Sequence, residues 1–146
     1  MTATITITNP ILSGMNPDPS WIWDDEFQRI VLVTSTFELV PGLPIYVSED
    51  MTCWKHVSNV IDADLARRLL IPFVDDSGGV YAPTLRRIHG KYVIACTIAR
   101  LDDRRAMEGG CTESELMRFH AAEGNFILEA DSIEGPWHGP FWIEGA

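Results

Sequence analysis

One aspartate in this chain sits in a stiff segment that suits acid–base chemistry. Asp18 lies between Pro17 and Pro19. Each proline fixes its own φ, and Pro19 also restricts the backbone of the residue before it. A carboxylate held in this way is preorganised to take a proton from water, as a general base does. The same Pro-Asp-Pro run is typical of a surface turn, and the chain has 21 acidic residues, so composition alone favours a solvated charge.

The cysteines and histidines lack the spacing of a metal site or a disulfide framework. The cysteines are odd in number and form no C-x-x-C pair, and the histidines are scattered along the chain. We therefore expect no metal site, and we interpret the histidines as surface or satisfied core residues. The residues concerned are Cys53, Cys96, Cys111, His56, His89, His120 and His138.

The bulk composition is that of a folded, acidic chain. Its 146 residues suit one domain or part of a larger one, and 46% of them are hydrophobic. The net charge of −10 opposes binding to phosphate backbones, so we expect no nucleic-acid partner. No apolar run approaches the length of a membrane span. Residues 1–10 lack the basic and apolar regions of a secretory signal, so as written the chain is expected in the cytoplasm.

Short β-strands are the elements that must position Asp18. Alternation of Thr and Ile or runs of β-branched residues, bounded by Gly, Pro and Asp turns, predict several of them. The predicted strands cover residues 4–8, 29–37, 43–48, 53–57, 91–99 and 125–130. Two short helices are predicted between strands: Asp62 would cap one over residues 63–70, and Thr112 with Glu115 would form a capping box ahead of residues 116–122. The chain is therefore predicted to be an all-β meander.

A pattern of strand, acidic turn and tryptophan occurs twice. Residues 46–50 lead to Trp54, and residues 128–131 lead to Trp137. A Pro-led strand pair precedes each copy. A four-stranded unit used twice is typical of β-propeller blades, with an ordinary β-sandwich meander as the alternative. Both tryptophans are predicted to lie in blade cores.

Several blocks resemble one enzyme family. Residues 9–20 (NPILSGMNPDPS) resemble the opening of family 43 glycoside hydrolases of the β-xylosidase and arabinofuranosidase type, in which NPxLxGxxPDPS carries the catalytic base. The resemblance continues at residues 35–38 (STFE), 41–54, 76–83 (DSGGVYAP) and 125–137. The blocks follow the family order. The resemblance implies a five-bladed β-propeller, of which residues 1–146 form the N-terminal portion, about the first two blades.

The resemblance also implies roles for three residues. Asp18 matches the base that activates water during inverting hydrolysis of an O-glycosyl bond. Phe37 matches an aromatic residue that walls the sugar at the bond being cut. Tyr81 stands where the family usually has a tryptophan in a W-A-P motif that lines the same pocket, which changes the shape of that subsite. Judged from residue type alone, Phe37 and Tyr81 are equally typical of core packing at strand ends.

Part of the catalytic set is expected outside this chain. An inverting glycosidase needs a general acid about 6.5–9.5 Å from its base. The resemblance implies that this acid is a glutamate in a later blade, and that a third acidic residue follows the end of this chain; Glu144 is not a substitute. Residues 99–124 depart from the family and are expected to form an insertion near the active-site face. We expect no cofactor, and the calcium ion that some relatives hold in the central channel would have its ligands beyond this chain.

Two functions remain open from the sequence. The first is a glycosidase for xylo- or arabino-configured oligosaccharides, complete only with a C-terminal portion, whose partner is a small carbohydrate substrate. The second is a non-catalytic propeller fragment that binds sugar or protein. About two blades alone would leave an open sheet edge and an exposed blade face, which predicts self-association.

Overall fold

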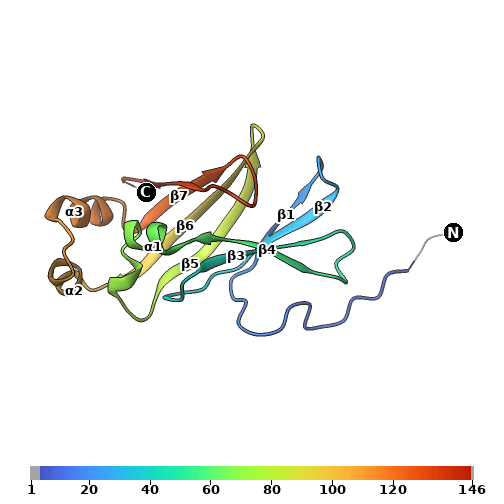
Figure 1. The fold of residues 1–146 in the computed structure, drawn as a ribbon, viewed down its shortest axis with the longest axis horizontal. Coiled ribbons are helices and arrows are strands. Elements are labelled where there is room, and N and C mark those ends of the chain that lie inside the picture. Colours follow the sequence, from blue (N-terminus) through green and yellow to red (C-terminus); the bar gives the residue numbers. More distant parts are fainter. Residues whose placement is uncertain (1–3, 146) are drawn as a thin grey trace.

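The protein is built from two four-stranded antiparallel sheets (Figure 1). The computed structural model describes residues 4–145. The first sheet consists of β1 (Ser20–Asp24), β2 (Arg29–Val33), β3 (Gly42–Ser48) and β4 (Lys55–Ile61), and the second of β5 (Val74–Ile88), β6 (Lys91–Leu101), β7 (Asn125–Ala130) and β8 (His138–Trp142). In both sheets the strand order follows the chain order. Each sheet is thus one consecutive meander, as in a propeller blade.

Within residues 4–145, four short helical segments lie in the connections between strands. They are α1 (Ala63–Arg68), η1 (Ile71–Phe73), α2 (Asp103–Glu108) and α3 (Glu113–Ala121). The labelled helices α1, α2 and α3 gather toward one end of the molecule (Figure 1). The predicted caps are confirmed: Asp62 accepts a hydrogen bond from the Leu65 amide at 2.8 Å, and Thr112 forms a capping box with Glu115. Helix α2, which begins after the N-cap Asp102, was not predicted from the sequence.

Three predicted strands differ from the observed ones. The strand predicted over residues 53–57 is observed as β4, over Lys55–Ile61. Residues 4–8 form an exposed irregular segment in place of the predicted strand, because no described neighbouring strand pairs with them and period-two alternation alone cannot hold a strand. The strand predicted over residues 29–37 ends at Val33. Beyond it the chain leaves the first sheet, and Phe37 pairs with Val80 of the second sheet in an isolated bridge.

The main core lies between the two sheets. Val31 and Ile45 from the first sheet and Leu85 and Phe126 from the second are fully buried in one cluster. Trp137 belongs to this cluster, as predicted.

The core prediction for Trp54 is wrong. This residue is half-buried, and its indole N–H donates to the Met51 carbonyl at 3.1 Å. Since its polar end is tied to the turn before β4, Trp54 closes that turn and does not join the cluster between the sheets.

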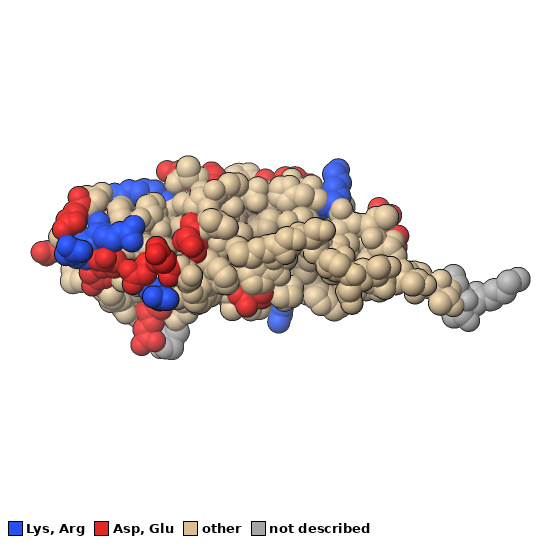
Figure 2. Space-filling model, turned by 90° about the horizontal axis from the view of Figure 1, so that it is seen from below, with Lys and Arg blue, Asp and Glu red and all other residues tan. Residues whose placement is uncertain are grey.

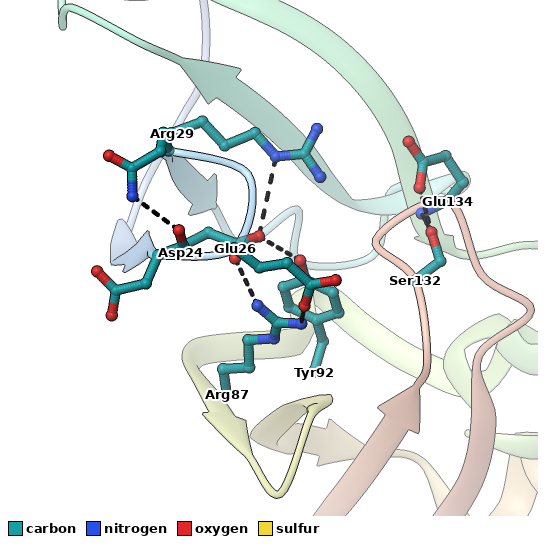
Figure 3. A network of polar contacts seen from close by, with 9 residues as sticks. Asp24, Glu26, Arg29, Arg87, Tyr92, Ser132 and Glu134 are labelled. Carbon is teal, nitrogen blue, oxygen red and sulfur yellow. Dashed lines mark hydrogen bonds and ion pairs between the residues drawn. The ribbon is translucent and has the colours of Figure 1, made fainter.

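A buried polar network joins the two sheets at the C-terminal end of β1 (Figure 3). Asp24 is fully buried, and its Oδ1 accepts from Nη1 of Arg87 at 2.6 Å. The Tyr92 hydroxyl donates to Asp24 Oδ2, and Arg87 also pairs with Glu26. A buried carboxylate is tolerable only when it is paired and hydrogen-bonded. The network therefore holds β1 at a fixed position on β5 and β6.

Charged side chains are unevenly spread over the surface. In Figure 2 they gather over the end of the molecule that carries α2 and α3, while the middle of the same face is largely uncharged. Trp21 and Trp23 are also exposed, at 59% and 44%.

Within residues 4–145, no helix has both the length and the apolar character needed to cross a membrane.

Candidate active site

Asp18 lies immediately before the strand that contacts the second sheet. It precedes β1 by two residues, and β1 packs against β5. Its φ is 49°, in the left-handed region that residues other than glycine rarely adopt. The side chain is exposed. Asp18 thus lies just outside the first strand. Its left-handed conformation is one that Pro19 does not favour, because a following proline biases the residue before it toward extended backbone.

Ser35 contacts the Asp18 segment twice. Its hydroxyl donates to Asp18 Oδ2 at 2.6 Å, and its amide donates to the Pro17 carbonyl at 2.9 Å. Within residues 4–145, Asp18 Oδ1 has no protein hydrogen-bond donor. The carboxylate thus has one oxygen tied to the protein and one open to a water molecule. Ser35 belongs to the STFE block noted in the sequence, but its role was not predicted.

Phe37 and Tyr81 form an aromatic pair across the two sheets. Their ring centroids are 5.0 Å apart, with 75° between the planes, a favourable edge-to-face arrangement. Both side chains are half-buried, so neither is a full core residue. The Tyr81 hydroxyl donates to the Ser77 carbonyl, which fixes its ring.

The backbone beside this pair is what brings the rings together. The Phe37 amide donates to the Val80 carbonyl at 3.2 Å, and the Val80 amide donates to the Phe37 carbonyl at 2.9 Å. This two-bond bridge joins the loop after β2 to β5. Two residues far apart in the sequence thereby present their rings on the same side of the junction between the sheets.

Cys96 lies under the site. Its thiol donates to the Tyr81 carbonyl at 2.9 Å. Burial raises the pKa of Cys96 to about 12, and the Asp18 carboxylate contributes to the same rise. Cys96 is therefore a neutral packing residue and not a nucleophile. It also borders a hollow of about 340 Å³, together with Ala82, Ala95, Thr97, Asn125 and Ile143.

The connection between β6 and β7 begins after Leu101, which pairs with Val74 at the start of β5. Thr97 is paired with both Tyr81 and Asn125, and the connection with α2 and α3 lies between Thr97 and Asn125 in the chain. That residues 99–124 lie near the active-site face stays a prediction. Glu144 is exposed in a turn after β8.

The arrangement suits proton transfer from water beside a flat, partly apolar ligand. One carboxylate oxygen is fixed, the other is open, and two aromatic rings stand at the same sheet junction. In the described part of the chain, no group of three or more His, Cys, Asp and Glu side chains could hold a metal ion.

Comparison with known proteins identifies related sequences. The profile of the family described as Glycosyl hydrolases family 43 matches residues 7–146. The non-reducing end alpha-L-arabinofuranosidase BoGH43B of Bacteroides ovatus is 36% identical over 140 residues, covering 94% of this chain and 22% of its own length. A xylan 1,3-beta-xylosidase of a Vibrio species is 34% identical over 139 residues, again covering 94% of this chain and 22% of its own.

Solved structures show the same similarity. The Bacteroides ovatus xyloglucan PUL GH43B structure superposes with a TM-score of 0.73 at 33% identity, over 95% of this chain and 23% of that chain. The xylan beta-1,4-xylosidase from Bacillus halodurans C-125 gives a TM-score of 0.69 at 29% identity, over 94% of this chain and 23% of that chain. This chain thus spans less than a quarter of the length of these relatives.

Proposed function

We propose that this chain, which belongs to glycosyl hydrolases family 43, supplies the general base and part of the sugar-binding wall of an inverting glycosidase. Its two sheets are about the first two blades of the five-bladed β-propeller formed by its structural neighbours. The observation that carries the proposal is the Asp18 carboxylate, tied at Oδ2 by Ser35 and open at Oδ1. The substrate class is xylo- or arabino-configured oligosaccharides, supported by relatives named as xylosidases and arabinofuranosidases.

Asp18 acts on the attacking water. As the water oxygen bonds to the anomeric carbon, Asp18 Oδ1 accepts one of its protons. The glycosidic carbon–oxygen bond breaks on the opposite face, and a general acid elsewhere in the protein protonates the leaving oxygen. Because Oδ2 stays hydrogen-bonded to Ser35, the carboxylate does not need to reorient during proton transfer.

Phe37 and Tyr81 hold the sugar ring beside this carboxylate. Aromatic faces offer apolar area to the C–H surfaces of a sugar, and the edge-to-face contact keeps each ring in place. A tyrosine at position 81 gives a smaller platform than the tryptophan expected in its place. The chemistry proposed for these residues requires no cofactor.

Hydrolysis of aryl β-xylosides and aryl α-arabinofuranosides by the full protein tests the proposal. Proton NMR of the first-formed product is expected to show inversion at the anomeric carbon. Asp18→Asn keeps the size of the side chain but cannot accept the proton, so kcat should fall by about 10²- to 10⁴-fold with the melting temperature unchanged. Retention of configuration, or near-normal turnover in Asp18→Asn, would contradict the role of Asp18. Sugar binding without any turnover would support the non-catalytic alternative.

A further inference from the structure

Ser35 is a buried residue that reaches an exposed one. Its exposed fraction is 0%, whereas Asp18 lies at the surface. Although the two residues are 17 positions apart in the sequence, two groups of Ser35 contact the Asp18 segment: the amide donates to the Pro17 carbonyl at 2.9 Å, and the hydroxyl donates to Asp18 Oδ2 at 2.6 Å. The first bond fixes the backbone that carries Asp18, and the second fixes its carboxylate.

The hydroxyl has two acceptors nearby and only one proton. It lies 2.6 Å from Asp18 Oδ2 and 3.4 Å from the Pro17 carbonyl. Hydrogen bonds to an ionised acceptor are shorter and stronger than those to a neutral one. The proton is therefore directed to the carboxylate. The terminal torsion of an aspartate has a broad, roughly two-fold profile, so this bond determines which oxygen is tied and which is open.

The backbone of Asp18 also needs external support. A non-glycine residue with φ of 49° occupies a sparsely populated region and stays there only when its surroundings over-determine it. The flanking prolines restrict the segment but do not define the carboxylate direction. Ser35 does both through its two bonds, and a residue outside the Pro-Asp-Pro run thereby completes its geometry.

We infer that Ser35 is a positioning residue for Asp18: it fixes the segment through Pro17 and holds Oδ2 so that Oδ1 stays open to the attacking water. This inference rests on the proposed role of Asp18 as general base. Ser35 itself does not touch the substrate or the transferred proton. Its effect on the reaction passes through the Asp18 carboxylate.

Ser35→Ala tests the inference, with Thr34→Val as the matched control. Thr34 is the preceding residue, is equally buried, and has a hydroxyl without a hydrogen-bond partner among the described residues. In Ser35→Ala, kcat on an aryl glycoside should fall roughly 10- to 10²-fold with KM changed less than about two-fold, because a hydrogen bond to a charged group and its orientation are lost. Thr34→Val should stay within about two-fold of the wild-type kcat. Equal rates for Ser35→Ala and wild type would overturn the inference.

A double variant separates this inference from the proposed function. If Asp18→Asn keeps near-normal turnover, the base assignment fails, whatever Ser35 does. If Asp18→Asn is impaired, adding Ser35→Ala should lower the rate by less than about two-fold more, because Ser35 acts only through Asp18. If Ser35→Ala lowers kcat in the Asp18→Asn background by as much as it does in the wild type, Ser35 has a general structural role and the inference is overturned.

A spectroscopic readout applies even to preparations that turn over no aryl glycoside. Three-bond couplings from Asp18 Cγ to its own amide nitrogen and carbonyl carbon report the χ1 rotamer. They should indicate one rotamer in the wild type and in Thr34→Val, and averaging over rotamers in Ser35→Ala. Averaged couplings in the wild type, or one rotamer in Ser35→Ala, would overturn the inference.

Discussion

Gly79 lies so close to Phe37 that a Cβ atom on it would stand 2.3 Å from the Phe37 carbonyl oxygen. That oxygen accepts the Val80 amide at 2.9 Å in the bridge between the two sheets. Gly79 also has a φ of +97°, which L side chains rarely adopt. A glycine is thus required for the first sheet to approach the second at the point where Phe37 meets Tyr81.

Gly79→Ala should therefore break the bridge and separate the aromatic pair. We expect the unfolding free energy to fall by more than about 1 kcal/mol, since alanine is strained at positive φ and the methyl group also collides with backbone. Gly90→Ala is the control, because Gly90 has φ +83° and no atom within 4 Å of an added Cβ. Denaturant unfolding of both variants measures the difference. Equal losses would mean that the close approach to Phe37 does not matter.

Asp24 should be the most sensitive charged residue between the sheets. Asp24→Asn leaves Arg87 with only its exposed partner Glu26, so the unfolding free energy should fall by roughly 3–5 kcal/mol. Asp64→Asn removes an exposed ion pair with Arg68 on α1 and should cost less than about 0.5 kcal/mol. Urea unfolding followed by fluorescence compares the two. Similar small losses would show that the buried network does not hold the sheets together.

Stability at high pH should depend on Tyr92. Burial, followed by the hydrogen bond to Asp24, raises the pKa of Tyr92 above its ordinary value of 10.0. Above pH 10 the unfolded chain loses this proton while the folded chain keeps it, so the stabilisation is complete below pH 10 and is lost as pH rises toward the folded-state pKa. The difference in unfolding free energy between wild type and Tyr92→Phe should shrink above pH 10. A difference that stays constant up to about pH 11.5 would contradict the shift.

Local signals predicted much of this structure. Asp62 and Thr112 carry cap chemistry that is readable within four residues, and both caps are present. The same rule applied to Asp102 would have found α2. Periodicity failed at residues 4–8, because alternation describes a strand's faces but not whether a neighbouring strand pairs with it. The prediction that Trp54 lies in a core was wrong for a related reason, since the burial of a side chain depends on which residues pack against that face of the sheet.

The candidate site was predictable only in part. The family blocks picked out Asp18, Phe37 and Tyr81, and the structure brings Phe37 into contact with Tyr81 and places Cys96, beneath Tyr81, within the influence of the Asp18 charge. The contact between Ser35 and Asp18 spans 17 residues and depends on where the chain leaves β2. A pairing of that kind follows from the packing of the two sheets and has no signature in local spacing.

The outer face of the first sheet should promote self-association. Trp21 and Trp23 alternate with Ile22, which packs on the core, so both point away from the second sheet. Exposed apolar area next to an unpaired strand edge favours association with another molecule. Light scattering after size exclusion should show oligomers of this chain at about 100 µM, reduced in Trp21→Ser/Trp23→Ser. Met117→Ser on α3, which is 65% exposed in the wild type, is the control and should leave association unchanged. A monomeric wild type would refute this prediction.

Phe37 and Tyr81 should behave as one unit in binding and in stability. Their ring centroids are 5.0 Å apart, so removing either ring leaves the other without its edge-to-face partner. In a double-mutant cycle of Phe37→Ala and Tyr81→Ala, the unfolding free energies should be non-additive by about 0.5–1.5 kcal/mol.

The same cycle measured through the dissociation constant for xylose should show that the first substitution removes most of the affinity and the second adds little. The pair Tyr46→Ala and His56→Ala provides the comparison, since these rings are 5.4 Å apart on β3 and β4, away from Asp18. That cycle should couple in stability and leave sugar binding unchanged. If both cycles alter sugar affinity equally, the losses come from general loosening of the fold, and the sugar wall must be sought elsewhere. If neither does, Phe37 and Tyr81 are packing residues, as their types alone would allow.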